Sequence, residues 1–469
     1  MLPKNVLPKK VLLILLLVCL SLLTACAQAT PTISQTSPTQ APDISPTSAP
    51  PKPTAQSATP GVAQTAMPIS NLYPPLNNAI PAGVLPQAGP LGNYVVFAWN
   101  NLGMHCFQLD YSVFLILPPY NIFWAQVISR GDEPRIVNSG VTVSYSMPQV
   151  TQPTQYTNFW DYAAAYGWNL QPGIGLTGKG TSGTLDAQGD AFVAAGVPVV
   201  DHNDDGTWDP YPFFLVNVKN GSGQTVAETV NVAPASTEMR CDLCHAGNTY
   251  QEVLQNILLT HDQSMGTELL KQSQSGKPVA CNTCHSDAAM GVMTNNGATQ
   301  SLSGAMHTFH ADKMQAGNLP GNICQSCHPG PSTQCLRDAM SEAGITCQDC
   351  HGGMADVGDP NRTPWVNLPQ CTSCHTSQLS KTNTKHIDNP NQNLTSSASA
   401  LYQNSKAHGG GGIYCAACHG SPHAIYPTVT ERDNQQSIRL QGHAGPIAEC
   451  SVCHTENPDE SFWHFGGDD

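Results

Sequence analysis

Hydrophobic and polar residues alternate in short runs over the first half of the chain. Between Val141 and Tyr145 the apolar positions are separated by Thr142 and Ser144, the period of two that is typical of a strand with one buried face. Three further runs rich in β-branched and aromatic residues span residues 94–99, 213–218 and 225–232, and Gly and Pro clusters separate them. Because no long helical period competes, the pattern predicts a β-rich domain, a sandwich or a barrel-like sheet, over residues 71–234.

From residue 235 onward the strand patterns fade, and short runs rich in Gly, Asn, Ser and Thr replace them. The apolar residues of this part are too few for a conventional core, so something other than side chains is expected to fill the interior. We therefore expect a second domain over residues 235–469, with little regular secondary structure and mostly short helices.

Two segments precede the predicted β-rich domain. Three lysines stand before an apolar run over residues 11–23, which is too short to span a bilayer and is typical of an export signal. The signal, residues 1–25, ends in Leu-Thr-Ala before Cys26, a sequence that resembles the lipobox of bacterial lipoproteins. The resemblance implies that Cys26 carries the acyl chains; the alternative is an ordinary cleaved signal with an incidental cysteine. Residues 26–70, rich in Pro, Thr and Ser, favour a disordered tether after the lipid anchor.

The lipobox and the net charge bear on location and partners. Ala27 stands where an aspartate often retains lipoproteins at the inner membrane, so we expect an exported protein anchored at the outer membrane, on its periplasmic or extracellular face. The formal net charge of −14 argues against nucleic acid or an anionic lipid surface as a partner. It would suit a basic redox partner.

The 18 cysteines of the chain would ordinarily suggest disulfides, but most of them fall into seven Cys-x-x-Cys-His segments. The cysteine pairs are Cys241 and Cys244, Cys281 and Cys284, Cys324 and Cys327, Cys347 and Cys350, Cys371 and Cys374, Cys415 and Cys418, and Cys450 and Cys453; the histidines are His245, His285, His328, His351, His375, His419 and His454. Two cysteines three positions apart lie on one side of a helical turn and can form thioethers to both vinyl groups of one haem. The adjacent histidine can then bind the iron as its proximal ligand. A zinc site would instead pool two Cys-x-x-Cys units and would need no histidine directly after them.

Histidine is concentrated in the same region, since only His105 and His202 of the 17 histidines precede residue 236. Beyond the proximal residues, the distal candidates are His261, His307, His310, His386, His408, His423 and His443, with His464 left as the surplus residue. They suffice for bis-histidine coordination of seven haems. The competing distal ligand is methionine, available at Met239, Met290, Met293, Met306 and Met314, which we interpret as packing residues against porphyrin faces.

In these motifs the chain resembles the bacterial multihaem c-type cytochromes, over about residues 236–469. The resemblance implies seven covalent haem c groups, with closely packed porphyrins in place of the missing core and electrons hopping along them. His423 follows His419 by four residues, a spacing common in that family. His408 and His443 each precede a motif by seven residues, which suggests two equivalent haem-binding modules. His307 and His310 share one face if helical and could serve two haems from one short helix.

Three functions remain open from these observations. The first is an electron carrier without its own substrate, acting between redox proteins or toward an extracellular electron acceptor. The second is a multihaem reductase with one five-coordinate catalytic haem. The third treats the β-rich domain as a binding module for a partner or surface. Binding of carbon monoxide to one reduced haem would favour the reductase.

Two further features of the sequence suggest sites outside the motifs. Residues 201–209 follow the first nine positions of an EF-hand-like Ca²⁺ loop. The oxygen ligands would come from Asp201, Asn203, Asp205, Thr207 and Asp209, with Gly206 at the turn. Position 12 is Pro212 rather than glutamate, so an acidic turn between strands is the alternative. Cys106 and Cys335 could form a disulfide or stay as two thiols. His105 is a candidate metal or haem ligand, or a hydrogen-bonded buried residue.

Overall fold

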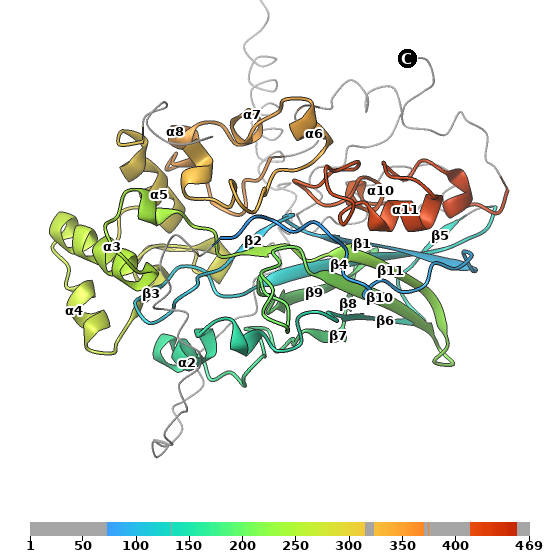
Figure 1. The fold of residues 1–469 in the computed structure, drawn as a ribbon, viewed down its shortest axis with the longest axis horizontal. Helices are drawn as coiled ribbons and strands as arrows, with labels where there is room; N and C mark the ends of the chain where they lie inside the picture. The colour runs from blue at the N-terminus through green and yellow to red at the C-terminus, as the bar shows by residue number, and fades with distance from the viewer. Residues whose placement is uncertain (1–72, 133, 315–322, 370–373, 375–412, 457–469) are drawn as a thin grey trace, which may run out of the picture. The chain divides into compact units, whose positions relative to one another are not determined.

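The computed structural model describes residues 73–132, 134–314, 323–369, 374 and 413–456, which all belong to one compact unit, residues 41–469 (Figure 1). The predicted export signal, the lipobox cysteine Cys26 and the tether lie outside the described residues. So do His386, His408, His464 and all of the fifth motif except Cys374. Within the described ranges, no helix has the length and apolar character needed to cross a membrane.

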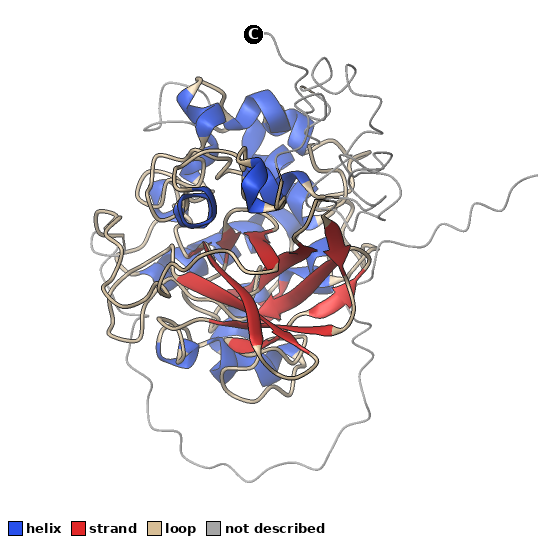
Figure 2. Cartoon of the chain, turned by 90° about the vertical axis from the view of Figure 1, so that its right-hand side faces the viewer, coloured by secondary structure: helices blue, strands red, loops and turns tan. Residues whose placement is uncertain are grey.

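Two antiparallel sheets form the N-terminal part, and Figure 2 shows their strands grouped together. One sheet has the order β1 (Tyr94–Asn100), β4 (Asn121–Ser129), β9 (Ala191–Val197) and β8 (Asp186–Gln188), with β5 (Arg135–Val137) also paired to β4. The other has the order β11 (Thr225–Val232), β10 (Phe213–Asn220), β6 (Val141–Ser146) and β7 (Ser182–Thr184). The four runs marked by the sequence pattern are β1, β6, β10 and β11, so the prediction of a β-rich N-terminal region is confirmed.

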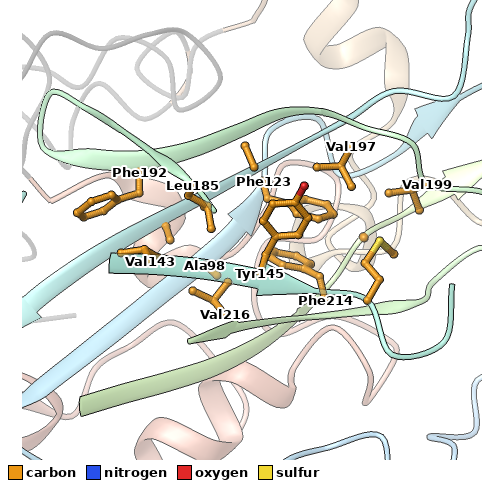
Figure 3. Close-up of a cluster of buried hydrophobic side chains, with 14 of the residues drawn as sticks. Ala98, Phe123, Val143, Tyr145, Leu185, Phe192, Val197, Val199, Phe214 and Val216 are labelled. Atoms are coloured by element: carbon orange, nitrogen blue, oxygen red, sulfur yellow. The ribbon is translucent and has the colours of Figure 1, made fainter. Parts of the chain in front are cut away.

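A hydrophobic core shared by both sheets holds them together (Figure 3). Phe123 of β4 stacks on Phe214 of β10 with ring centres 4.1 Å apart, and it meets Tyr145 of β6 edge-on at 5.4 Å. Val96 and Ala98, alternate residues of β1, belong to the same core. Because each large apolar side chain stabilises the fold by about 1.5–3 kcal/mol when fully buried, this cluster fixes how the sheets face one another.

The other face of β1 is buried as well, under segments from the C-terminal end of the chain. The cluster on this face contains Val95, Phe97 and Trp99 of β1 together with Tyr414, Ala416, Ala417 and Val452. The last four belong to α10 (Cys415–His419), its preceding residue and the turn η11 (Cys450–Val452). In Figure 1, α10 lies next to β1 and α11 (Gln435–Gln441) next to β11, and both pairs are in contact. The sixth and seventh Cys-x-x-Cys-His motifs thus rest on the five-stranded sheet.

Short helices dominate the described residues after β12 (Ala235–Ser236), which pairs with β2 (His105–Cys106). They are α4 (Leu269–Gln274), α5 (Leu302–Ala311), α6 (Ala339–Glu342), α7 (Cys347–His351) and α8 (Met354–Val357), while α2 (Phe159–Ala163) precedes them in the β-rich part. One helix, α3 (Tyr250–Met265), is longer than expected; a capping box of Thr249 and Glu252 satisfies its first N–H groups. The small strand β13 (Val279–Ala280) pairs with β3 (Phe114–Leu115).

Candidate haem-binding sites

All six Cys-x-x-Cys-His motifs that the structure describes in full form a single helical turn. Two are the helices α7 and α10, and four form 3-10 turns: η5 (Cys241–Leu243), η6 (Cys281–Thr283), η8 (Ile323–Ser326) and η11. In those four, the N–H of His245, His285, His328 and His454 donates to the carbonyl of the first cysteine at 2.9, 3.1, 2.9 and 2.8 Å. This bond closes the turn and leaves both cysteines and the histidine in the order that two thioethers and one iron ligand need.

The rings of several proximal histidines are oriented by hydrogen bonds at Nδ1. The Nδ1 atoms of His245, His285 and His454 lie 3.2, 2.9 and 3.1 Å from the side-chain oxygen of Asn256 and the carbonyls of Gln300 and Asp132. A histidine whose Nδ1–H is donated in this way presents Nε2 as the metal-binding nitrogen. The orientation therefore suits iron coordination.

Two proximal histidines each face a second histidine from a distant part of the chain. The ring centres of His328 and His307 are 6.0 Å apart, and those of His351 and His423 are 6.2 Å apart. A metal–imidazole bond is about 2 Å long and the ring centre lies about 1 Å behind the nitrogen, so one iron between two imidazoles separates the centres by about 6 Å. Burial lowers the pKa of His328 and of His423 to about 4, which keeps both in the neutral form that binds metals.

Two further proximal histidines lie near distal candidates. Burial lowers the pKa of His245, and the charge that His310 can carry lowers it further; His261 responds in the same way to burial and to His285. His307 and His310 both belong to α5, and each Nδ1 lies 2.7 Å from the carbonyl four residues earlier. This helix thus presents one histidine toward His328 and another toward His245, the arrangement expected from their spacing.

Cysteines of several different motifs lie close together. Cys324 donates a hydrogen bond to Cys347, which lowers the pKa of Cys347 to about 6. Electrostatic contacts also join Cys327 to Cys241 and Cys244, Cys350 to Cys374, and Cys453 to Cys418. The first, third, fourth and fifth motifs therefore form one series, and the sixth and seventh form another. His423, just after the sixth motif, faces His351 of the fourth and links the two series.

A cavity of about 340 Å³ adjoins the fourth motif. Its lining consists of Cys350, His351, Arg362, Val366, Asn367, Leu368 and Pro369. Its volume falls within the range of cofactor sites, about 300–1,000 Å³, although it is open and its lining is mostly polar. In the part of the chain that the structure describes, no three His, Cys, Asp or Glu side chains converge as ligands of a metal ion. The thiols and imidazoles of the one-turn motifs are the groups that covalent haem attachment requires.

Comparisons with other proteins add nothing to this geometry. No protein-family model, curated protein or solved structure matches the chain. The interpretation of the motifs therefore depends on their own arrangement.

The distal candidate His443 lies in an exposed loop between α11 and η11. Its Nδ1 is 3.0 Å from the carbonyl of Ala444, and its Nε2 is 3.4 Å from Oε1 of Glu449. These hydrogen bonds raise its pKa, which favours the charged form. To bind iron through Nε2, His443 would have to release Glu449.

The predicted calcium ligands at the two ends of the loop are committed to other groups. The carboxylate of Asp209 accepts hydrogen bonds from Nη1 and Nη2 of Arg432, both at 2.8 Å. The guanidinium therefore supplies the positive charge that a calcium ion would otherwise supply. One oxygen of Asp201 accepts from the N–H and hydroxyl of Thr237 at 3.0 and 2.7 Å, and the other lies 2.9 Å from Nδ1 of His202.

The middle residues of this loop bond to one another. Asp205 accepts the N–H of Thr207 at 2.9 Å, and the carbonyl of Thr207 accepts the N–H of Asn203 at 2.9 Å. These hydrogen bonds are those of an acidic turn, while Oδ1 of Asn203 is buried without a hydrogen-bond partner among the described residues, so the calcium site stays a prediction.

Outside the motifs, His105 and the two remaining cysteines lie at the junction of the two parts of the chain. His105 is buried with Nε2 2.7 Å from Oδ1 of Asn101, and burial lowers its pKa to about 3, which makes it a neutral, hydrogen-bonded residue. Cys106 and Cys335 are free thiols. Burial and the neighbouring Cys335 raise the pKa of Cys106, so the two thiols lie close together without a disulfide.

Sequence reasoning missed two buried ion pairs that position these segments. Arg337 donates Nε and Nη2 to Asp433 at 2.7 and 2.6 Å, with both side chains at most 2% exposed, and its guanidinium lies 4.3 Å from the ring centre of Tyr211. The second pair is Arg432 with Asp209. No local sequence pattern predicts either ion pair, because the two residues of the first pair are 96 positions apart and those of the second are 223 positions apart.

Proposed function

We propose that the chain is a lipid-anchored heptahaem c-type cytochrome that transfers electrons between redox partners or to an extracellular acceptor. The observation that carries the proposal is the pairing of His328 with His307 and of His351 with His423 at the spacing of two imidazoles on one iron. A haem iron with two histidine ligands exchanges single electrons and offers no open position to a substrate.

In this proposal the polypeptide holds and orders the cofactors. The one-turn motifs supply the thioethers, the Nδ1 hydrogen bonds orient the imidazoles, and burial keeps them neutral. The hydrogen bond between Cys324 and Cys347 supports close attachment of neighbouring haems. The N-terminal part, interpreted as a β-sandwich, is the scaffold of a C-terminal multihaem domain, and acylated Cys26 holds both at the outer membrane.

The proposal is tested with protein exported from cells that carry the c-type maturation machinery. Intact mass should equal the lipidated chain plus seven haems. A Cys347→Ser, Cys350→Ser variant should lose one haem, whereas Cys106→Ser, which changes a cysteine outside the motifs, should keep seven. A mass without haem adducts would end the proposal.

Electron paramagnetic resonance and carbon monoxide then separate the carrier from the reductase. Low-spin signals from every oxidised haem, with no spectral change when carbon monoxide is added to the reduced protein, are expected of bis-histidine coordination. A carbon monoxide adduct at one haem would instead favour the reductase.

A further inference from the structure

Arg362 is the permanently charged residue in the lining of the cavity beside the fourth motif. Its guanidinium reaches the carbonyl of Val357 only at a long 3.4 Å. The neighbouring carboxylate of Asp359 accepts from the backbone and side-chain N–H groups of Asn361 at 2.8 and 3.0 Å. Over the ranges that the structure describes, no carboxylate forms an ion pair with Arg362.

Two fully buried arginines of this part of the chain differ from Arg362, which is only partly buried. Arg337 and Arg432 each have a carboxylate in a two-pronged pair, at 2.6 and 2.8 Å. Burial lowers the pKa of Arg362, which reflects the cost of keeping its charge away from water. Among the described residues no carboxylate compensates this partly buried guanidinium, which can therefore bind a carboxylate of a ligand.

The position of Arg362 indicates where that anion would come from. The cavity that it lines also contains Cys350 and His351 of the fourth motif. A haem carries two propionate carboxylates, and a planar guanidinium binds a carboxylate through two parallel hydrogen bonds.

We propose that Arg362 binds a propionate of the haem attached at Cys347 and Cys350 and raises the reduction potential of that haem. The inference rests on the proposed function, because it requires haem at the fourth motif. Reduction adds one negative charge at the iron, so a nearby fixed cation stabilises the reduced form. Arg362 acts as a positioning and tuning residue, since it is not an iron ligand.

The test compares Arg362→Gln, which removes the charge, with Arg362→Lys, which keeps it but cannot form the two-pronged contact. Lys219→Gln is the control, because it removes one positive charge from an exposed position on β10. Each protein is purified with its haems, weighed intact and titrated against redox potential by visible spectroscopy. The Cys347→Ser, Cys350→Ser variant identifies the haem in question as the one missing from its titration.

The expected result is a lower midpoint potential for that haem in Arg362→Gln, a smaller decrease in Arg362→Lys, and no change in Lys219→Gln. Loss of that one haem from Arg362→Gln but not from Arg362→Lys would also support the contact. An Arg362→Gln titration that matches the unmodified protein, or an equal shift of all seven haems, would overturn the inference. A wild-type mass without haem would instead refute the proposed function, so the two failures are distinguishable.

Discussion

The buried pair of Asp209 and Arg432 allows the sharpest prediction for stability. The two hydrogen bonds of the pair are 2.8 Å long, and the carboxylate and guanidinium side chains are 5% and 2% exposed. Asp209→Asn keeps the size of the side chain but leaves the guanidinium buried without a counter-charge. Removing one partner of a buried pair costs about 3–5 kcal/mol. Because the total stability of a folded domain is about 5–15 kcal/mol, the loss should be large.

Urea unfolding of the haem-loaded protein, followed by far-ultraviolet circular dichroism, measures this loss. Asp186→Asn is the matched control, since Asp186 pairs with Lys179 while 73% of its side chain is exposed, and it should cost less than about 1 kcal/mol. A double variant, Asp209→Asn with Arg432→Met, should recover much of the loss because no unpaired charge remains buried. The reasoning is refuted if Asp209→Asn and Asp186→Asn unfold at the same urea concentration.

The same experiment bears on the calcium prediction. Because Asp209 is bonded to Arg432, a chelator should leave the unfolding midpoint of the unmodified protein unchanged. A midpoint that rises with added calcium and falls with the chelator would show that the loop does bind the ion.

Three further predictions concern the histidine pairs and their surroundings. His307→Met should alter the paramagnetic resonance signal of one haem and His310→Met that of another, because the two residues of α5 face different motifs; a change in the same signal would contradict this pairing. Gly103→Ala should destabilise the protein by about 1–3 kcal/mol more than Gly140→Ala, measured by thermal unfolding, since both glycines have positive φ but only at residue 103 would the new Cβ overlap the carbonyl of Pro422. Stability should fall as the pH drops from about 6.5 to about 3, by up to about 1.4 kcal/mol per pH unit, because burial lowers the pKa of His105 to about 3 whereas the unfolded chain takes up its proton near 6.5. Urea midpoints that stay constant over this range would contradict the last of these.

The sequence predicted β1, β6, β10 and β11 but missed the central strands β4 and β9. In β4 six of nine residues belong to the shared core or to the cluster on the outer face, so both faces of the run Asn121–Ser129 are apolar and no alternation marks it. In β9 the residues are mostly Ala and Gly, and Gly196 adopts a φ of 80°, so the usual β-branched signal is weak. Both strands are recognised only once the segments that cover them are known.

The candidate site, too, could be predicted from the sequence only in part. The attachment motifs are local, and their cysteines and histidines can be read directly from the spacing. The partner of each proximal histidine depends on contacts between segments far apart in the chain, such as His351 with His423, and spacing alone does not encode these. The role proposed for Arg362 was not predicted for a related reason, because it depends on the cavity that Arg362 lines, and the sequence does not reveal this cavity.

The cover on the outer face of β1 has a consequence for the order of folding. A polypeptide is synthesised from its N-terminus, so both sheets can assemble before residues 414–417 and 452 are available to cover this face. Until then Phe97, Trp99 and Trp124 form an uncovered apolar surface, the kind that promotes aggregation of partly folded chains. The segments of the last two cysteine motifs therefore complete the fold of the sheet, and a chain truncated before them would expose this apolar face.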